Sequence, residues 1–217
     1  MPPPPPNPPL SYTTHPSLSP DYNIPVSTWV AHHDSHLCVG VGVLHHATTD
    51  PNVTVPRILL IQRAPSEAFG HRWEIPGGSA ELQEPTLFAS AGRELYEETG
   101  LRVTAFTSLL GSYTWIDKNP DTGEAIYDKD GRCKWLKVSF VADVEDSTES
   151  GGEPPQVTLD PDEHQAFVWA SEEEVRAGKV GVVNLFWLSD NQRADVLRAF
   201  EIARAARDPP CDYLAFG

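Results

Sequence analysis

The hydrophobic residues of this chain fall into blocks separated by polar segments, and most of these blocks predict strands. Runs rich in Val, Ile and Leu occupy residues 37–44 and 57–61, and each is bounded by polar loop residues. Longer runs at residues 103–116 and 135–144, and a last one at residues 165–169, have the same character. These five segments are therefore expected to be strands.

Three other segments predict helices. Residues 87–99 repeat hydrophobic side chains every three or four positions, which gives a helix with one core-facing stripe. Residues 172–176 and 191–206 predict a short helix and a terminal one. Because strands lie before and after a central helix and another helix ends the chain, we expect a mixed α/β layered domain over about residues 27–207.

The ends of the central helix can be placed from local residue types. Pro85 suits the first helical position, where its missing N–H costs nothing. Gly100 suits the left-handed residue that follows a helix. The acidic residues between these two positions are therefore expected on a helix.

Proline is concentrated at the beginning of the chain, where ten of the 21 prolines precede Ser27. Such a segment cannot build a packed core, so residues 1–26 are expected to form a disordered or polyproline II tail. A solvated spacer and a ligand for a proline-reading partner are both compatible with this composition. Residues 208–217 are expected to form a second, short tail.

The charge balance restricts the classes of ligand. The chain has 217 residues with 16 Lys and Arg against 31 Asp and Glu, a net charge of −15. This acidity argues against binding duplex nucleic acid, because affinity for duplexes comes from neutralising phosphates with basic side chains. A phosphorylated small molecule stays compatible with the charge only if divalent cations lie between its phosphates and the protein carboxylates.

Hydropathy and cysteine usage point to a protein of a reducing compartment. The mean hydropathy is −0.34 and no long apolar run occurs, so no membrane span is expected. The three cysteines are far apart, form no CxxC pair, and follow no secretory segment. We therefore expect the cytoplasm, with the nucleus as a second location.

Three glutamates gather at the end of the predicted central helix. Glu94 lies three residues before Glu97 and four before Glu98, so all three are neighbours on the helix surface. Like charges at these spacings destabilise a helix, and Arg93 can neutralise only part of them. The group is either a solvated face or a site for a hard cation, of which Mg²⁺ is the best match.

The surrounding residues favour the cation site, because the segment resembles the Nudix box. That pattern is Gly, five residues, Glu, seven residues, then Arg-Glu-aliphatic-x-Glu-Glu-x-Gly-aliphatic. The chain matches its fixed residues with Gly78, Glu84, Arg93, Glu94, Leu95, Glu97, Glu98, Gly100 and Leu101.

The match has one departure, since eight residues rather than seven separate Glu84 from Arg93. The extra residue is expected either where the loop joins the helix or as a bulge near Gly92. Two flanking segments also resemble the superfamily: residues 73–76 look like the strand that leads into the box, and residues 163–169 look like a late strand.

The resemblance to the Nudix hydrolase superfamily implies an α/β/α sandwich with a mixed sheet. It also implies hydrolysis of a diphosphate linkage in a nucleoside diphosphate derivative by attack of water at phosphorus, with Mg²⁺ or Mn²⁺ as cofactor. The implied metal-site residues are Glu94, Glu97 and Glu98, together with the Gly78 carbonyl.

The resemblance and the local chemistry together suggest roles for further residues. Arg93 would orient a carboxylate through charge-assisted hydrogen bonds. The general base is either a glutamate of the box, Glu94 or Glu98, or an acid from a later loop, for which Glu163 is the candidate, although Glu163 could equally be an ordinary loop carboxylate. Arg63 and Arg72 are candidates for phosphate contact, although each could equally be a surface charge. Trp73 could stack on a base or could simply pack in the core.

Two further functions remain open. The intact box favours an active hydrolase over a module that binds a nucleotide or an ADP-ribose-like ligand without turning it over. A protein that acts through its proline-rich tail would lose function when residues 1–25 are deleted, whereas an enzyme should tolerate that deletion.

Overall fold

The computed structural model describes residues 11–50, 53–119, 121–145 and 152–207. Seven strands form one sheet in the order β1-β5-β6-β2-β3-β4, with β7 also paired to β3. Two pairs, β1 with β5 and β2 with β6, run parallel, and the others run antiparallel, so the sheet is mixed. The strands are β1 (Thr13–Thr14), β2 (His36–Asp50), β3 (Val53–Arg63), β4 (Trp73–Glu74), β5 (Val103–Ile116), β6 (Lys134–Val144) and β7 (His164–Ser171).

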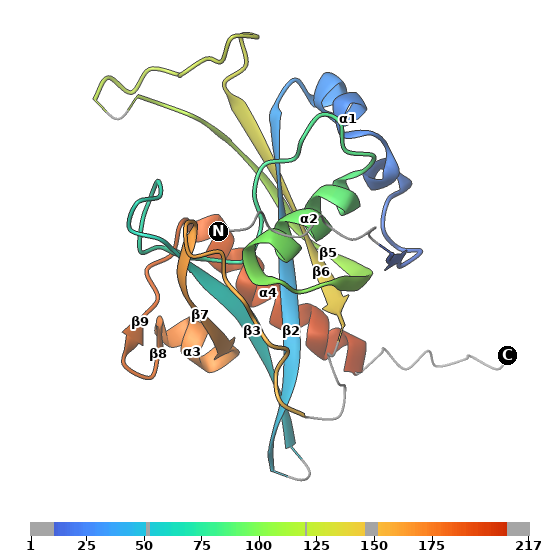
Figure 1. The fold of residues 1–217 in the computed structure, drawn as a ribbon, viewed down its shortest axis with the longest axis vertical. Coiled ribbons are helices and arrows are strands. Elements are labelled where there is room, and N and C mark those ends of the chain that lie inside the picture. Colours follow the sequence, from blue (N-terminus) through green and yellow to red (C-terminus); the bar gives the residue numbers. More distant parts are fainter. Residues whose placement is uncertain (1–10, 51–52, 120, 146–151, 208–217) are drawn as a thin grey trace, which may run out of the picture.

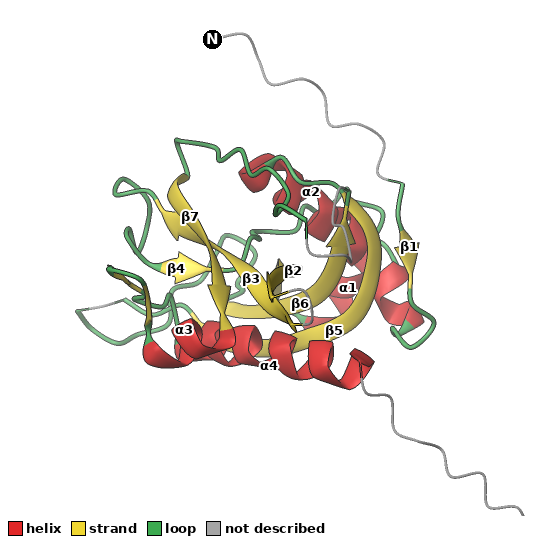
Figure 2. Cartoon of the chain, turned by 90° about the horizontal axis from the view of Figure 1, so that it is seen from below, coloured by secondary structure: helices red, strands yellow, loops and turns green. Residues whose placement is uncertain are grey.

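Helices cover both faces of this sheet (Figures 1 and 2), which gives the expected α/β/α sandwich. One face carries α1 (Val26–His33) and α2 (Leu87–Thr99), and the opposite face carries α4 (Asp190–Arg207). Three smaller elements complete the described fold: the 3-10 helix η1 (Pro20–Asn23), the short helix α3 (Glu172–Ala177) and a hairpin of β8 (Lys179–Val180) and β9 (Val183–Asn184). No helix of the described ranges is long and apolar enough to cross a membrane.

The alternation of side chains along β3 shows how the two layers share one sheet. Leu59 and Ile61 pack in the core on the α2 side, whereas Ile58 and Leu60 pack in the core on the α4 side. Successive side chains of a strand point to opposite faces, so a strand covered by helices on both faces is hydrophobic at every position. This explains why residues 58–61 of β3 are hydrophobic without interruption in the sequence.

The predicted strands and helices are confirmed, with small differences at their ends. The central helix is α2 and the late strand is β7, and Gly100 has the expected left-handed backbone with φ of 72°. The expected position of Pro85 is wrong, because Thr86 caps the helix and Pro85 precedes the cap. The Thr86 hydroxyl accepts a hydrogen bond from the Ala89 N–H at 3.0 Å, which satisfies a free donor of the first turn.

The beginning of the chain is a second correction. The expected tail over residues 1–26 includes residues 11–25, which pack on the domain instead. Leu18 is buried, and Tyr22 lies edge-on to Phe140 with ring centroids 5.2 Å apart. These apolar side chains lie within a proline-rich composition and fill the α2 side of the core. Residues 1–10 and 208–217, which complete the two expected tails, lie outside the described residues.

Candidate active site

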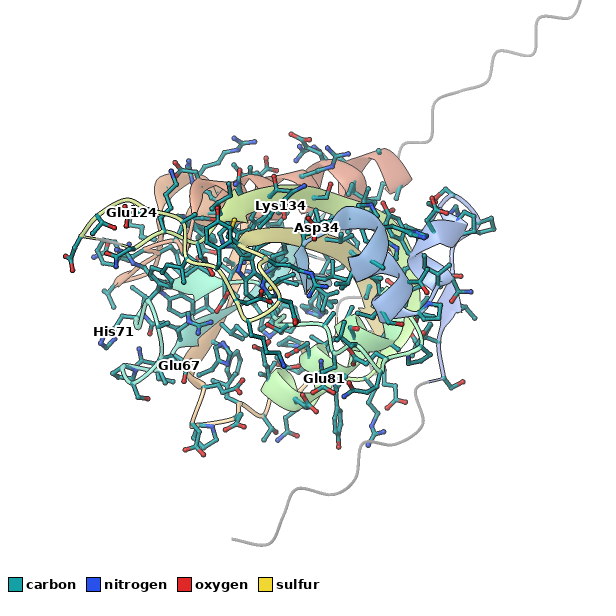
Figure 3. The ribbon with its side chains drawn as sticks, turned by 90° about the horizontal axis from the view of Figure 1, so that it is seen from above. Asp34, Glu67, His71, Glu81, Glu124 and Lys134 are labelled. Carbon is teal, nitrogen blue, oxygen red and sulfur yellow. The ribbon has the colours of Figure 1, made fainter. Side chains whose placement is uncertain are left out.

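A cavity of about 650 Å³ opens where the loop before α2 meets the sheet. It is lined by residues from the six strands β2 to β7, from α2 and from the beginning of α4, together with the loops after β3, before α2 and before α4. Glu67 on the loop after β3 and Glu81 on the loop before α2 both lie toward the α2 side of the sheet (Figure 3). The lining residues with titratable side chains are Cys38, Arg63, Glu67, Glu74, Glu94, Glu98, Tyr113, Lys137, Glu163 and His164.

A glycine pair brings the backbone against β2 at the cavity wall. Gly77 has φ of 147°, and a Cβ there would lie 2.2 Å from the Val39 carbonyl oxygen. The Gly78 carbonyl accepts a hydrogen bond from the Val39 N–H at 2.9 Å. A Cβ at Gly78 would lie 2.6 Å from Glu94 Oε2. Glycine is therefore required at position 77 by its backbone angle and by the close approach to β2, whereas a side chain at position 78 would displace the Glu94 carboxylate.

The two buried carboxylates of α2 lie behind this glycine pair. Glu98 accepts a hydrogen bond from the Gly77 N–H at 2.6 Å. Burial raises the pKa of Glu98 well above its usual value, and the charges of Glu74 and Glu94 raise it further. Burial also raises the pKa of Glu94 to about 7, although Arg93 acts in the opposite direction. Such a site favours a bound cation, because a cation would stabilise both ionised carboxylates.

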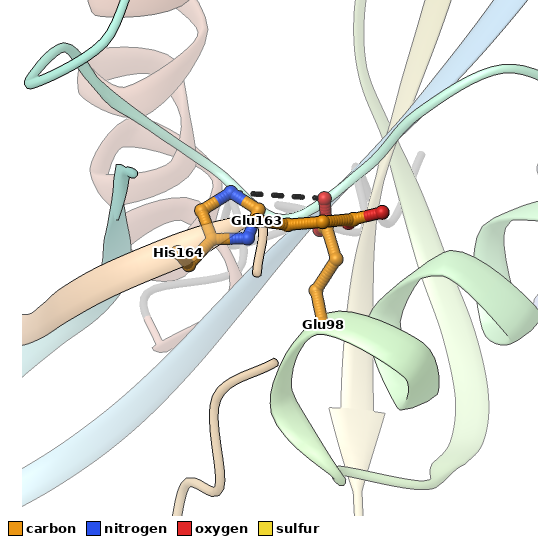
Figure 4. A group of neighbouring side chains, drawn as sticks. All are labelled: Glu98, Glu163 and His164. Carbon is orange, nitrogen blue, oxygen red and sulfur yellow. Dashed lines mark ion pairs between the residues drawn. The ribbon is translucent and has the colours of Figure 1, made fainter. Parts of the chain in front are cut away.

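The carboxylate of Glu163, just before β7, and the imidazole of His164, the first residue of β7, approach Glu98 (Figure 4). One ligand atom each from Glu98, Glu163 and His164 lie within 4.8 Å of one another. His164 Nε2 is 3.8 Å from Glu98 Oε1, and the histidine side chain is 1 % exposed. Both ring nitrogens lack a hydrogen-bond partner in the described chain. This group can therefore supply oxygen and nitrogen ligands to a divalent ion.

Glu74 on β4 completes the acidic wall in a different electrostatic state. Burial would raise its pKa, but His164, Lys137 and Arg63 together hold the pKa below its usual value. Arg63 Nη1 lies 2.8 Å from Glu74 Oε1, and Arg63 Nη2 lies 3.1 Å from Glu67 Oε2. The guanidinium of Arg63 lines the cavity, yet it is already bound to these two carboxylates.

Arg93 ties the loop before α2 to the helix. Its guanidinium contacts Glu84 at 2.7 Å, Glu94 at 3.0 Å and Glu97 at 2.7 Å. It also donates to the Ser79 carbonyl at 3.0 Å. Glu97 is exposed and lies outside the cavity lining. Because Arg93 contacts both Glu97 and the buried Glu94, it orients the Glu94 carboxylate from the rim of the cavity.

Of the nine predicted site residues, five line the cavity, Arg93 lies next to it through its contact with Glu94, Glu97 lies next to it through its contact with Arg93, and Arg72 and Trp73 lie apart. Gly78, Glu94, Glu98, Glu163 and Arg63 all line the cavity. Arg72 is exposed and outside the lining. Trp73 is 1 % exposed, packs on the α4 side of the sheet, and donates its indole N–H to the Asn184 carbonyl at 3.1 Å. Since neighbouring residues of a strand face opposite sides, Glu74 reaches the cavity and Trp73 does not.

Sequence reasoning gave no role to three residues of the cavity. Glu74 and His164 belong to the two flanking segments that resemble the superfamily, so this resemblance was a usable signal for both residues. Lys137 carried no comparable signal, because a lysine in a strand is usually a solvated residue. Only the pairing of β6 with its neighbours places Lys137 at the cavity.

Comparison with known proteins agrees with this geometry. The family model described as the NUDIX domain matches residues 38–186. The RNA pyrophosphohydrolases of Bartonella quintana (strain Toulouse) and Bartonella tribocorum are 44% and 42% identical to this chain over 65 residues, which is 30% of this chain and 35% of each relative. The chain therefore spans about a third of the length of these curated relatives.

Solved structures share the fold at low sequence identity. The crystal structure of a MutT/nudix family protein from Enterococcus faecalis is 18% identical and has a TM-score of 0.51. The likeness covers 83% of this chain and 68% of that one. The box, the sandwich around it and the match over residues 38–186 have one common explanation: this chain belongs to the NUDIX domain family.

Proposed function

We propose that this chain is a metal-dependent pyrophosphohydrolase that cleaves a diphosphate linkage in a nucleoside diphosphate derivative. The observation that carries the proposal is the cavity in which Glu94, Glu98 and Glu163 converge beside the glycine pair. Membership in the NUDIX domain family supports the same reaction class.

The residues present suit Mg²⁺ or Mn²⁺. Glu98 and Glu163 offer hard oxygen ligands within 4.8 Å of each other and of His164, and Glu94 lines the same cavity. Bound divalent ions would neutralise the diphosphate and make a bound water more acidic. Glu97 would join this set only by turning from Arg93 toward the cavity, because its carboxylate now pairs with that guanidinium.

The protein side chains have separate tasks in this proposal. Glu163 is exposed to solvent at the cavity and takes the proton from the attacking water as general base. Arg93 fixes the orientation of Glu94 through their 3.0 Å contact. Gly77 fixes Glu98 by its N–H, so the two buried carboxylates keep one geometry before the substrate arrives.

A small nucleotide-type molecule is the proposed substrate, because the net charge of −15 disfavours a long polyanion. A second candidate is the 5′ end of an RNA chain. It is supported by the names of the two Bartonella relatives and by their identity over 65 residues. Both candidates place a diphosphate linkage in the same cavity.

The test is a substrate panel measured with the Glu98→Gln variant. Nucleoside triphosphates, dinucleotides, nucleotide sugars, coenzyme A and an RNA with a 5′-triphosphate are incubated with and without Mg²⁺, and the products of diphosphate cleavage are separated and quantified by anion-exchange chromatography. We expect metal-dependent cleavage with the native protein. Loss of an outer-shell partner alone costs about 10–100-fold, so removal of a ligand carboxylate should lower turnover by at least about a hundredfold.

Glu173→Gln provides the matched control. It removes the same charge from an exposed position on α3, far from the box in sequence, and should leave turnover unchanged. Near-normal turnover in Glu98→Gln would contradict the assignment of that residue. Binding of nucleotides or ADP-ribose without turnover of any panel member would instead favour the catalytically silent binding module.

A further inference from the structure

Lys137 occupies the middle of the cavity floor. In the sheet it pairs with Cys38 of β2 on one side and with Tyr113 of β5 on the other. All three residues line the cavity. Lys137 is only 5 % exposed, so it is largely shielded from bulk water although it lines the cavity.

The neighbouring strand provides room for this side chain. A Cβ added at Gly40 of β2 would lie 2.9 Å from Lys137 Cε and 2.8 Å from Ser139 Oγ. A larger residue at position 40 would therefore displace the end of the lysine stem. Gly40 therefore leaves the space in which the lysine side chain lies along the cavity floor.

Lys137 differs from the other cations at the site because, among the residues that the structure describes, no side chain forms an ion pair with it. Arg63 is paired with Glu74 and Glu67, and Arg93 is paired with three carboxylates. Within the described ranges, no carboxylate oxygen lies within 4.0 Å of the Lys137 ammonium. Burying an unpaired ammonium is unfavourable, so this arrangement calls for a negative partner from elsewhere.

Acidic groups surround Lys137 at longer range. Its charge acts to lower the pKa of Glu98 on α2, Glu74 on β4 and Asp195 on α4. These groups attract the ammonium but do not bind it, so its hydrogen-bond donors remain free for a ligand. A phosphate oxygen is the acceptor that best matches a lysine in this setting, since lysine binds phosphate as a point charge.

We infer that Lys137 forms a phosphate subsite on the cavity floor and donates a charge-assisted hydrogen bond to a non-bridging oxygen of the substrate's diphosphate. The subsite rests on the proposed function for its substrate. A diphosphate in the cavity would thus be contacted both by cations bound to the carboxylates of α2 and by Lys137, because all of these residues line the same cavity.

Methylenediphosphonate is a suitable probe, because it has the phosphate oxygens but no base and no hydrolysable bridge. Its affinity is measured by titration calorimetry at saturating Mg²⁺ for the native chain and for Lys137→Met. Loss of one charge-assisted hydrogen bond should weaken binding by about 10–100-fold. Lys134→Met, at an exposed position of the same strand, is the control and should bind the probe like the native protein.

Two further measurements separate a phosphate subsite from a structural role. The Mn²⁺ affinity, measured by paramagnetic resonance, and the melting temperature should not fall in Lys137→Met, because the substitution removes a positive charge from beside the metal-site carboxylates. Probe affinity within twofold of native would overturn the inference, as would a loss of probe affinity, Mn²⁺ affinity and melting temperature together. If the Met variant does not fold, Lys137→Gln is subjected to the same three measurements.

The subsite and the proposed function can fail independently. A native chain that hydrolyses no panel member, yet binds the probe in a Lys137-dependent way, would contradict the hydrolase and retain the subsite. A native chain that hydrolyses a substrate which Lys137→Met binds and turns over equally well would retain the hydrolase and overturn the subsite.

Discussion

Within one cavity, neighbouring carboxylates have pKa values shifted in opposite directions. Burial raises the pKa of Glu94 and of Glu98, whereas His164, Lys137 and Arg63 together outweigh the burial of Glu74 and lower its pKa. The difference follows from contacts, because only Glu74 has both a guanidinium and an imidazole close to it. The pKa of Glu74 thus lies below its usual value without a metal, whereas a bound cation would lower the raised pKa values of the two carboxylates of α2.

The contribution of Glu94 to the stability of the metal-free protein should fall as the pH rises. The pKa of Glu94 is 4.5 as its reference value and about 7 in the folded protein. Between these values the folded state holds more protons than the unfolded state, so this contribution is largest below pH 4.5 and is lost as the pH rises through 7. Urea unfolding in EDTA at pH 5 and pH 8 measures this decline.

The Glu94→Gln variant isolates the contribution of this residue. Its unfolding free energy should decline less than that of the native protein between pH 5 and pH 8, by at most about 3 kcal/mol. The comparison is needed because the lowered pKa of His45 acts in the opposite direction below pH 6.5. An equal pH dependence for both proteins would show that Glu94 does not titrate in this window.

At the scale of elements, α2 and the loop before it act as one unit. The loop departs from the Nudix pattern by one residue, and the structure accommodates it between Glu84 and the Thr86 cap, without a bulge at Gly92. Glu84 still contacts Arg93 at 2.7 Å. The helix and its acidic end therefore keep their geometry because the extra residue lies outside the helix.

Replacing Arg93 by lysine should loosen this unit while preserving its charge. A lysine cannot reproduce the forked contacts to Glu84, Glu94 and Glu97, because its ammonium is a single point of charge. We expect kcat/KM to fall by roughly 10–100-fold, as for loss of a partner that orients a metal ligand. Arg198→Lys, at an exposed position of α4, is the control, and equal kinetics of the two variants would contradict this role.

The sequence predicted elements well where local rules apply. The span of α2 and its Gly100 end depend on periodicity and on a left-handed cap, both of which are local. The short helix α1 was not predicted, because eight residues carry too little periodic signal. The box residues could be assigned because they lie within one loop and helix, whereas Lys137 comes to the site through strand pairing that the sequence does not specify.

At the scale of the whole molecule, the beginning of the chain divides into two parts. Residues 11–25 pack against the α2 side, with Tyr12 hydrogen-bonded to Thr86 at 3.2 Å and Leu18 buried. Composition alone predicted a tail through residue 26, because proline is frequent on both sides of this boundary. The apolar residues between the prolines are the signal that separates the packed part.

Two deletions test this division. Deleting residues 2–10 should leave hydrolysis and the melting temperature unchanged, since the cavity is built from residues 38–192. Deleting residues 2–25 should destabilise the protein by at least about 2–3 kcal/mol, the value for one fully buried side chain such as Leu18. Equal melting temperatures for the two proteins would contradict the packing, and loss of function in the shorter deletion would favour a role for the proline run.

The pairing of β2 with β6 has a consequence for how the chain folds. These parallel strands join positions about a hundred residues apart, as in Cys38 opposite Lys137, and the cavity adds residues up to Gln192. Contacts between such distant positions form slowly, because a long loop must close before they contribute. We therefore expect the glutamate-rich helix, which depends on local contacts, to form before the cavity, which requires the pairing of β2 with β6.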